Sequence, residues 1–440
     1  MLKAISLKNF KSYKSARLPL ASLTVLIGAN ASGKSNAIEG MRLLSWLAQG
    51  QKLSSIQYAV QQADQIVRGR LDNLAFEQRN CFELGAETTR KEWNHLNIGF
   101  DRRADGLHIA SESLTHADAS VPLYTLDQPS SGQSTDAGVA YNNFARGGKK
   151  PHITCNDQAA IFTQLTSPAT FDSAHSRSRR EISAATKELE RWLSGMLFLD
   201  PVPARMREYA FPSDSSLQSD GRNLSAVLFN LWGRARSDVG STEKSRRDAI
   251  LSFIRSLPEQ DIADLDFLEE PRGGVMVKLT ETFGNREKVY DASLLSDGTL
   301  RVLSIAAAML SAPVGSLVII EEIDNGVHPS RAHHLLDNIL EIARERDLRV
   351  LLSTHNPALL DALPDPALPD VVFCYRDQND GSSRLLRLQD APDYPELIAQ
   401  DSLGRLVTSG ALERFVKQPE HQDRKQKALD WLEKIQQEDA

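Results

Sequence analysis

Ser22-Leu-Thr-Val-Leu-Ile-Gly28-Ala-Asn-Ala-Ser-Gly33-Lys34-Ser35 is the stretch of sequence that decides the fold of this chain. It matches the pattern G-x-x-x-x-G-K-[ST], whose fixed positions here are Gly28, Gly33, Lys34 and Ser35. A short β-branched apolar run precedes the pattern, and apolar residues at helical spacing from 37 to 48, closed by Gly50, follow it. The sequence therefore predicts a buried strand that leads through a glycine-rich loop into a helix, the context that this pattern requires.

Each part of this loop suits the binding of a polyphosphate. Glycines let the backbone wrap the phosphates with its N–H groups, and the start of the following helix adds positive potential. Lys34 is placed to neutralise the outer phosphates, and the hydroxyl of Ser35 to contact Mg²⁺. The predicted contacts are Gly28, Asn30, Ala31, Ser32, Gly33, Lys34, Ser35 and Asn36. The alternative is a glycine-rich turn that carries a lysine by chance.

The composition indicates a sizeable intracellular protein. Its 440 residues, 41% of them hydrophobic, suffice for about two to three domains or for one domain with a large insertion. It has no run of about 18 apolar residues and no signal-peptide pattern, so we expect no membrane span. Cys81, Cys155 and Cys374 are few and scattered, which fits the reducing cytoplasm. The formal charge of −7 restricts any nucleic-acid surface to a local patch.

A second set of polar residues follows two apolar strands in the C-terminal half. Ser316-Leu-Val-Ile-Ile-Glu321-Glu322-Ile-Asp324 is a strand that ends in carboxylates, and Arg349-Val-Leu-Leu-Ser-Thr-His355 is one that ends in a histidine. Buried parallel strands deliver their C-terminal residues to one ligand crevice, so we expect these groups to lie beside the glycine-rich loop. Upstream, Leu294-Leu-Ser-Asp-Gly-Thr299 precedes an apolar helix, where the serine by itself would be an ordinary helix cap.

Together with Leu7-Lys-Asn-Phe-Lys-Ser-Tyr13 near the N-terminus, these motifs resemble the head domain of the RecF/SMC-type ABC ATPases. The resemblance implies that the cofactors are ATP and Mg²⁺, that Glu321 helps to hold the metal, and that Lys34, Glu322 and His355 are catalytic. Glu322 would be the general base and His355 the switch beside the γ-phosphate. Ser296 and Gly298 would form a degenerate signature for ATP bound to a second subunit, and Asp324 to Pro329 the D-loop. Most family members carry Asp where this chain has Glu321, which leaves the metal coordination open.

The resemblance also implies an α/β fold, an ABC-type P-loop NTPase head with a mixed β-sheet flanked by helices and an inserted α+β lobe. We expect the N-terminal part of the head at 1–95, the inserted lobe at 96–290 and the C-terminal part of the head at 291–390. A helical tail is expected at 391–440, with a charged helix from Lys425 to Gln437. Within the lobe, the polar stretch from Asp127 to Gly148 predicts a mobile loop.

Two functions are open to such a head. Two copies would sandwich ATP, and slow hydrolysis would gate a separately encoded nuclease or toxin in an anti-phage defence complex. This follows from a resemblance to stand-alone RecF-like heads, because the tail leaves no room for the TOPRIM nuclease domain of OLD-type relatives. The alternative is a RecF-like DNA-repair or recombination ATPase that binds DNA through basic segments at Ser173–Arg180 and Arg234–Arg247. A solvated surface is the other explanation of those segments.

Overall fold

A six-stranded sheet forms the centre of the computed structural model, which describes residues 1–56, 66–132, 134–214, 216–237, 250–254, 261–284, 286–324, 329–391 and 394–417. In spatial order its strands are β10 (Leu197–Leu199), β14 (Leu317–Ile320), β15 (Arg349–Ser353), β3 (Leu23–Ile27), β16 (Val371–Arg376) and β17 (Ser383–Arg387). The first five strands run parallel, and β17 pairs antiparallel with β16 at the edge. The mixed sheet predicted from the sequence is confirmed.

Helices cover both faces of this sheet, because its strands are apolar on both sides. One face packs against α1 (Lys34–Ala48), and the other packs against α8 (Asp297–Ser311) and α9 (Pro329–Glu345). Successive residues of a strand point to opposite faces, so Leu26 of β3 joins the core under α1, whereas Val25 joins the core with α8 and α9. The parallel strands all end at one edge, which brings the loops after β3, β14 and β15 together.

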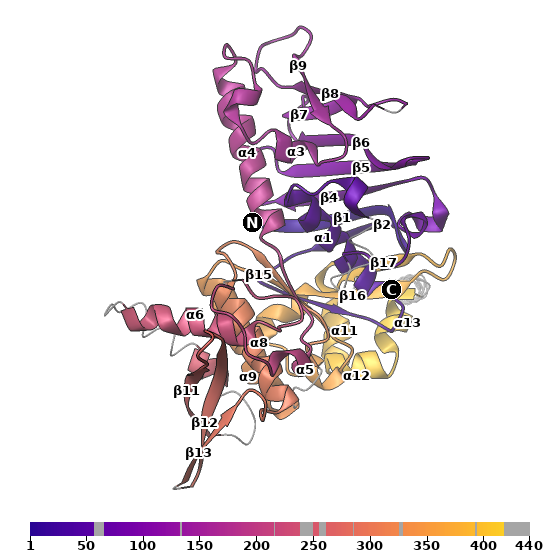
Figure 1. Ribbon diagram of the computed structural model, residues 1–440. Helices are drawn as coiled ribbons and strands as arrows, with labels where there is room; N and C mark the ends of the chain where they lie inside the picture. The colour runs from indigo at the N-terminus through magenta and orange to yellow at the C-terminus, as the bar shows by residue number, and fades with distance from the viewer. Residues whose placement is uncertain are drawn as a thin grey trace, which may run out of the picture.

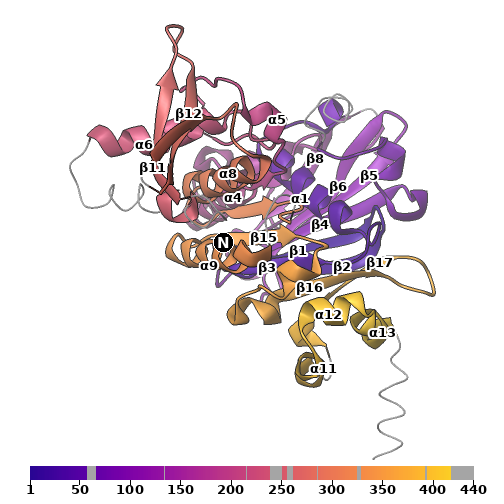
Figure 2. The same cartoon turned by 90° about the horizontal axis from the view of Figure 1, so that it is seen from below.

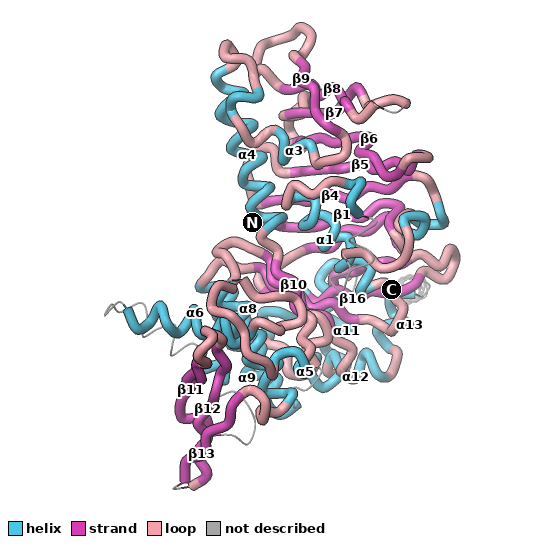
Figure 3. Tube along the Cα trace, in the orientation of Figure 1, coloured by secondary structure: helices cyan, strands magenta, loops and turns pink. Residues whose placement is uncertain are grey.

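An eight-stranded antiparallel sheet packs on the other side of α1 (Figures 1 and 3). Its order is β2 (Tyr13–Pro19), β1 (Leu2–Phe10), β4 (Cys81–Thr88), β5 (His95–Arg103), β6 (Gly106–Thr115), β7 (Tyr124–Gln128), β8 (Asp136–Tyr141) and β9 (His152–Asn156). The approach is close, since a Cβ on Gly40 of α1 would lie 2.6 Å from a methyl of Leu7. The long helix α4 (Ser176–Ser194) packs beside α1. The domain boundary expected at residue 95 falls at the first residue of β5, which pairs directly with β4.

Two local expectations are corrected by this sheet. The predicted mobile loop at 127–148 contains β8, which pairs with both β7 and β9 and buries Ala137, Val139 and Tyr141. The sequence turns polar after Leu7, which by itself favours a loop after the first strand, but the chain makes only a tight turn there, because Tyr13 already begins β2. In both places cross-strand pairing and burial of a few apolar residues outweigh the polar composition of the surrounding sequence.

A smaller lobe extends from the head and contains a three-stranded antiparallel sheet beside α6 (Leu224–Ser237) (Figure 1). The strands are β11 (Asp261–Glu269), β12 (Val275–Phe283) and β13 (Arg286–Asp291). This agrees with an inserted α+β lobe. Elsewhere in the described chain, short helices include α3 (Ile161–Gln164), α5 (Pro203–Met206) and α10 (Pro357–Leu360).

The C-terminal part of the described chain forms three short helices that pack beside the central sheet (Figure 2). They are α11 (Tyr394–Gln400), α12 (Leu403–Thr408) and α13 (Ala411–Lys417). Leu403, Leu406 and Leu412 are buried in the core shared with α8 and α9. The charged helix predicted from Lys425 to Gln437 lies outside the described residues. Within the described residues, we find no helix that combines the length and the apolar character needed to cross a bilayer.

Candidate nucleotide-binding site

The glycine-rich loop between β3 and α1 leaves no space for side chains at two of its glycines. Gly28 and Gly33 have φ of 144° and 123°, a region that residues with a side chain rarely adopt. A Cβ on Gly28 would lie 2.1 Å from the carbonyl oxygen of Cys374, and one on Gly33 would lie 2.3 Å from Oγ of Ser383. The loop is thus pressed against β16 and β17, which fixes the direction of its N–H groups.

The turn between β1 and β2 supports this loop from below. The buried Tyr13 hydroxyl donates to the carbonyl oxygen of Gly33 at 3.0 Å, and the Asn36 side chain donates to Oγ of Ser12 at 2.8 Å. Lys11 is nearly buried, and its Nζ lies 3.0 Å from the carboxylate of Glu39 on α1. The N-terminal Lys-Ser-Tyr sequence therefore holds the loop and the first turns of α1 in place.

A cavity of about 330 Å³ opens above the loop and contains most of the predicted site. The predicted residues that line it are Asn30, Ala31, Ser32, Gly33, Lys34, Ser35, Asn36, Glu321, Glu322 and His355. Gly28 lines an adjoining cavity of about 230 Å³, which also includes His355 and reaches α13. Ser296 and Gly298 line neither cavity. The fold thus brings together the residues after β3, β14 and β15, as the sequence predicts for parallel strands.

Lys34, the first residue of α1, turns its ammonium group back toward the loop. Its Nζ donates to the carbonyl oxygens of Gly28 at 2.5 Å and Ala29 at 3.1 Å. Burial lowers the pKa of Lys34, and the nearby Cys374, Glu322 and Asp324 act in the opposite direction. The site therefore holds a partly desolvated cation on the floor of the cavity, where it would contact a phosphate oxygen at close range.

Three carboxylates follow β14, and each has a different environment. Oε1 of Glu321 accepts a hydrogen bond from Arg42 at 2.8 Å. Glu322 is exposed to the cavity with φ of 48°, and its backbone N–H donates to Oγ of Ser353 at 3.0 Å, which holds this unusual conformation. Asp324 is 5% exposed and lies 3.5 Å from Nδ1 of His355, while its Oδ1 is buried without a hydrogen-bond partner in the described structure. Of the three, Glu322 is the most exposed, and it lines the cavity in which water would meet the nucleotide.

The residues of the site that were not predicted from the sequence include Arg42, Arg68, Asp200 and Arg376. Arg68 and Arg376 line the cavity with Lys34, and Nε of Arg376 donates to the carbonyl oxygen of Ala31 at 3.0 Å. Asp200 follows β10, and its pKa is raised by burial and then by Glu322. Of these four residues, only Asp200 could have been found in the way that Glu321 was, because it too directly follows an apolar strand.

The donor groups fit a magnesium ion that is held jointly with phosphates. The Ser35 hydroxyl and the Glu321 carboxylate line the same cavity, and the unpartnered Oδ1 of Asp324 is a third oxygen donor nearby. Among the described residues, no three His, Cys, Asp or Glu side chains are grouped as a metal cage. Mg²⁺ is typically bound by one or two carboxylates together with substrate phosphates, so this sparse donor set suits Mg²⁺ with a nucleotide.

The predicted signature residues lie at the exposed start of α8. Ser296 is the N-cap of this helix, and its Oγ accepts from the backbone N–H of Thr299 at 3.1 Å. It is exposed, and Gly298 is partly exposed. Residues 325–328 of the predicted D-loop, including His328, lie outside the described residues.

The first basic segment partly packs on the protein itself. The guanidinium of Arg177 lies 4.0 Å from the ring centroid of Phe144, and Nε of Arg179 donates to the carbonyl oxygen of Pro168 at 3.0 Å. Arg180 is 3.2 Å from its neighbour Glu181. Residues 238–249 and the side chains of Arg234 and Arg236 in the second basic segment lie outside the described part.

Comparison with known proteins gives two family matches and a set of similar folds. The family described as "AAA ATPase domain" matches residues 1–117, and the one described as "AAA domain, putative AbiEii toxin, Type IV TA system" matches residues 159–361. No curated protein matches the sequence.

Solved structures with a similar fold include three heads of SMC proteins. The SMC head bound to the C-terminal winged-helix domain of ScpA is 15% identical, with a TM-score of 0.48 over 89% of this chain and 99% of that chain. The head with an extended coiled coil bound to the C-terminal domain of ScpA, from Pyrococcus furiosus, is 13% identical, with a TM-score of 0.45 over 90% and 99%. The head from Thermotoga maritima is 12% identical, with a TM-score of 0.39 over 88% and 98%.

Proposed function

We propose that this chain, in which residues 1–117 and 159–361 each match a family of AAA domains, is an ABC-type ATPase of the RecF/SMC-like kind that serves as the regulatory ATPase of an anti-phage defence complex. ATP-driven pairing of two copies would gate a separately encoded nuclease or toxin. The observation that carries the proposal is the single cavity in which Lys34, Ser35, Glu321, Glu322 and His355 meet.

The residues of this cavity divide the work of ATP hydrolysis. The loop N–H groups and Lys34 would bind the β and γ phosphates, and Ser35 and Glu321 would hold Mg²⁺, which when bound would withdraw charge from those phosphates. Glu322, the exposed acid, accepts a proton from the attacking water, a role typically worth about 10²–10⁴ in rate. His355 donates to the γ-phosphate, with Asp324 beside its other ring nitrogen.

Pairing of two heads completes each site. At the start of α8, Ser296 is exposed and Gly298 partly exposed, and neither lines its own chain's cavity, which supports a role toward ATP on a second copy. The N-terminus of α8 offers backbone N–H groups to an anion. ATP would favour the paired state through its higher affinity for that state, and hydrolysis at Glu322 would release it. Turnover in such a switch is slow.

One of the family matches supports a defence setting. The family that matches residues 159–361 is described as an AAA domain and a putative toxin of a type IV toxin–antitoxin system, and such a system fits a chain that works with an effector. The second candidate is a DNA-repair ATPase of the RecF kind. Arg177 and Arg180 are exposed near the start of α4, which favours direct contact with DNA phosphates.

Affinity purification of a tagged Glu322→Gln chain from its own host, with ATP and Mg²⁺, tests the proposal. We expect a nuclease or toxin subunit to co-purify in a fixed ratio, because the variant keeps ATP and stays paired. The Lys34→Ala chain is the control and should lose this subunit, since it cannot retain ATP. Recovery of the Glu322→Gln chain without a nuclease or toxin subunit would refute the defence role. Recovery together with DNA that dissociates at high salt concentration would also refute it and would favour the DNA-binding role.

A further inference from the structure

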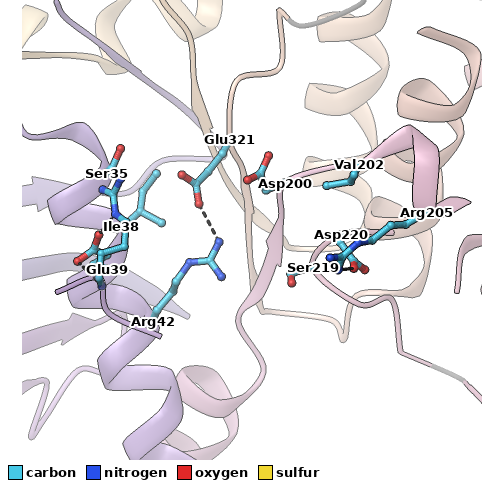
Figure 4. A pocket seen from close by; sticks show the side chains of 11 residues that line it. Ser35, Ile38, Glu39, Arg42, Asp200, Val202, Arg205, Ser219, Asp220 and Glu321 are labelled. Atoms are coloured by element: carbon cyan, nitrogen blue, oxygen red, sulfur yellow. Dashed lines mark hydrogen bonds and ion pairs between the residues drawn. The ribbon is translucent and has the colours of Figure 1, made fainter. Parts of the chain in front are cut away.

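One face of α1 continues from the phosphate loop to the acid after β14. Ser35, Ile38, Glu39 and Arg42 follow the i, i+3, i+4, i+7 spacing that places residues on one side of a helix. All four line a cavity of about 360 Å³, which also includes Asp200 and Glu321 (Figure 4). The helix that begins at the phosphate loop therefore also presents Arg42 to Glu321.

Arg42 fixes Glu321 by one hydrogen-bonded ion pair. Nη2 of Arg42 lies 2.8 Å from Oε1 of Glu321, and both side chains are 20% exposed. The guanidinium itself is held, because its Cζ lies 4.7 Å from the ring centroid of Phe198 on β10. The partners are 279 residues apart in sequence, so the pair ties α1 to the end of β14.

The ion pair with Arg42 restricts a glutamate side chain that would otherwise be more mobile than an aspartate at position 321. Glutamate has one more rotatable bond than aspartate, so its carboxylate is less fixed at the same backbone position. Arg42 donates to Oε1, and Figure 4 shows the carboxylate lying between Ser35 and Asp200. Hydrogen bonds to a metal-ligating carboxylate orient it, and their loss typically costs about 10–100-fold in metal affinity.

We propose that Arg42 is a positioning residue that orients the Glu321 carboxylate toward the Mg²⁺ site at Ser35. The inference rests on the proposed ATPase function, since it concerns the metal that accompanies the nucleotide. Arg42 touches neither the nucleotide nor the water in this assignment. It acts through Glu321 alone.

Binding of a fluorescent ATP analogue, measured by anisotropy at increasing MgCl₂ and in excess EDTA, tests this role. All chains carry Glu322→Gln to prevent turnover. With Arg42→Met, we expect the Mg²⁺ concentration for half-maximal binding to rise about 10–100-fold, with metal-free affinity unchanged. Arg42→Lys should restore part of the effect, because an ammonium can pair with Oε1 but does not reproduce the planar fork.

Two further chains separate positioning from a structural effect. Arg205 lines the same cavity and pairs with Asp220 at 2.7 Å, so Arg205→Met is the matched control and should leave the Mg²⁺ dependence unchanged. In a chain that carries Glu321→Asp, the side chain is one methylene shorter and no longer contacts Arg42. Adding Arg42→Met there should change the Mg²⁺ dependence far less than it does beside Glu321.

The outcomes distinguish this inference from the proposed function. If the Glu322→Gln parent binds no ATP analogue with or without Mg²⁺, the proposed function itself is refuted. If the parent needs Mg²⁺ and Arg42→Met needs the same amount, only the positioning role is refuted. If Arg42→Met needs less Mg²⁺, Arg42 competes with the cation for Glu321, which also overturns the proposal. Loss of metal-free affinity in Arg42→Met would indicate a distorted loop and refute it as well.

Discussion

Lys34 and Glu322 face the same cavity, but their surroundings suit them to different steps. Lys34 is partly desolvated and directed at the loop, where a phosphate would replace carbonyl oxygens as its partner. Glu322 is exposed, with its backbone held by Ser353. We therefore expect ATP binding to depend on the cation and ATP hydrolysis on the acid.

Changing these two residues should separate ATP binding from ATP hydrolysis. We expect Lys34→Ala to abolish ATP binding in isothermal titration calorimetry, because a charged contact to phosphate is lost inside a cavity. Glu322→Gln should bind ATP with near-normal affinity and lose about 10²–10⁴ in turnover, since only proton acceptance is removed. Unchanged affinity in Lys34→Ala would contradict the assignment of the site.

At the scale of elements, a buried carboxylate joins two neighbouring strands of the eight-stranded sheet to the helix α3. Glu112 on β6 accepts hydrogen bonds from the Tyr124 hydroxyl on β7 at 2.8 Å and from the N–H groups of Ile161 and Phe162 at 2.7 Å each, at the start of α3. Burial raises the pKa of Glu112 to about 7, against these hydrogen bonds, which favour the ionised form.

This carboxylate should give the fold a measurable pH dependence. The folded pKa of about 7 exceeds the ordinary 4.5, so the folded state keeps a proton that the unfolded chain releases. The protonated carboxyl group stabilises the folded state fully below pH 4.5, less as the pH rises, and no longer above about pH 7. The difference between the folded and the ordinary pKa corresponds to about 3 kcal/mol in the free energy of unfolding. Thermal unfolding of Glu112→Gln across this window should show a flatter pH dependence than the unsubstituted chain.

The slope, and not the overall stability, is the diagnostic quantity. Glutamine replaces one acceptor oxygen by a donor NH₂, so Glu112→Gln should be less stable at low pH, and its deficit should shrink as the pH rises toward 7. Glu341, which is exposed on α9, provides the control, and Glu341→Gln should leave the slope in place. An unchanged slope in Glu112→Gln would show that another group titrates.

At the scale of the whole molecule, the nucleotide cavity and the start of α8 are separate surfaces of one chain. The nucleotide cavity contains Lys34, and the start of α8 contains Gly298. Gly298 does not line the nucleotide cavity of its own chain. If two heads pair through these surfaces, each ATP contacts both copies. A defect in one surface can then be complemented by a chain that carries a defect in the other.

Mixing two inactive chains should restore hydrolysis. Gly298→Glu places an acid in the first turn of α8, which favours the helix but repels a phosphate on the partner. Neither this chain nor Lys34→Ala should hydrolyse ATP alone. An equal mixture should regain up to about a quarter of normal activity, because half of random dimers are mixed and each holds one intact site. The matched control is Gly298→Ala, and no recovery in the mixture would contradict composite sites.

The sequence by itself determined the local units of this protein. β3, α1 and β14 form where the apolar runs predict them, because helical and strand periodicities reflect contacts close in the chain. The parallel-sheet rule then sufficed to place Lys34, Glu322 and His355 in one cavity. Most of the candidate site was predictable for this reason.

Only the tertiary structure decided the contacts between units. The pairing of β8 on both edges, the ion pair of Arg42 with Glu321 and the burial of Glu112 each join segments that no local pattern relates. Arg42 alone is an ordinary helix residue, and its partner is 279 residues away. Such contacts depend on how the two sheets pack around α1, since burial and long-range geometry determine which polar groups meet.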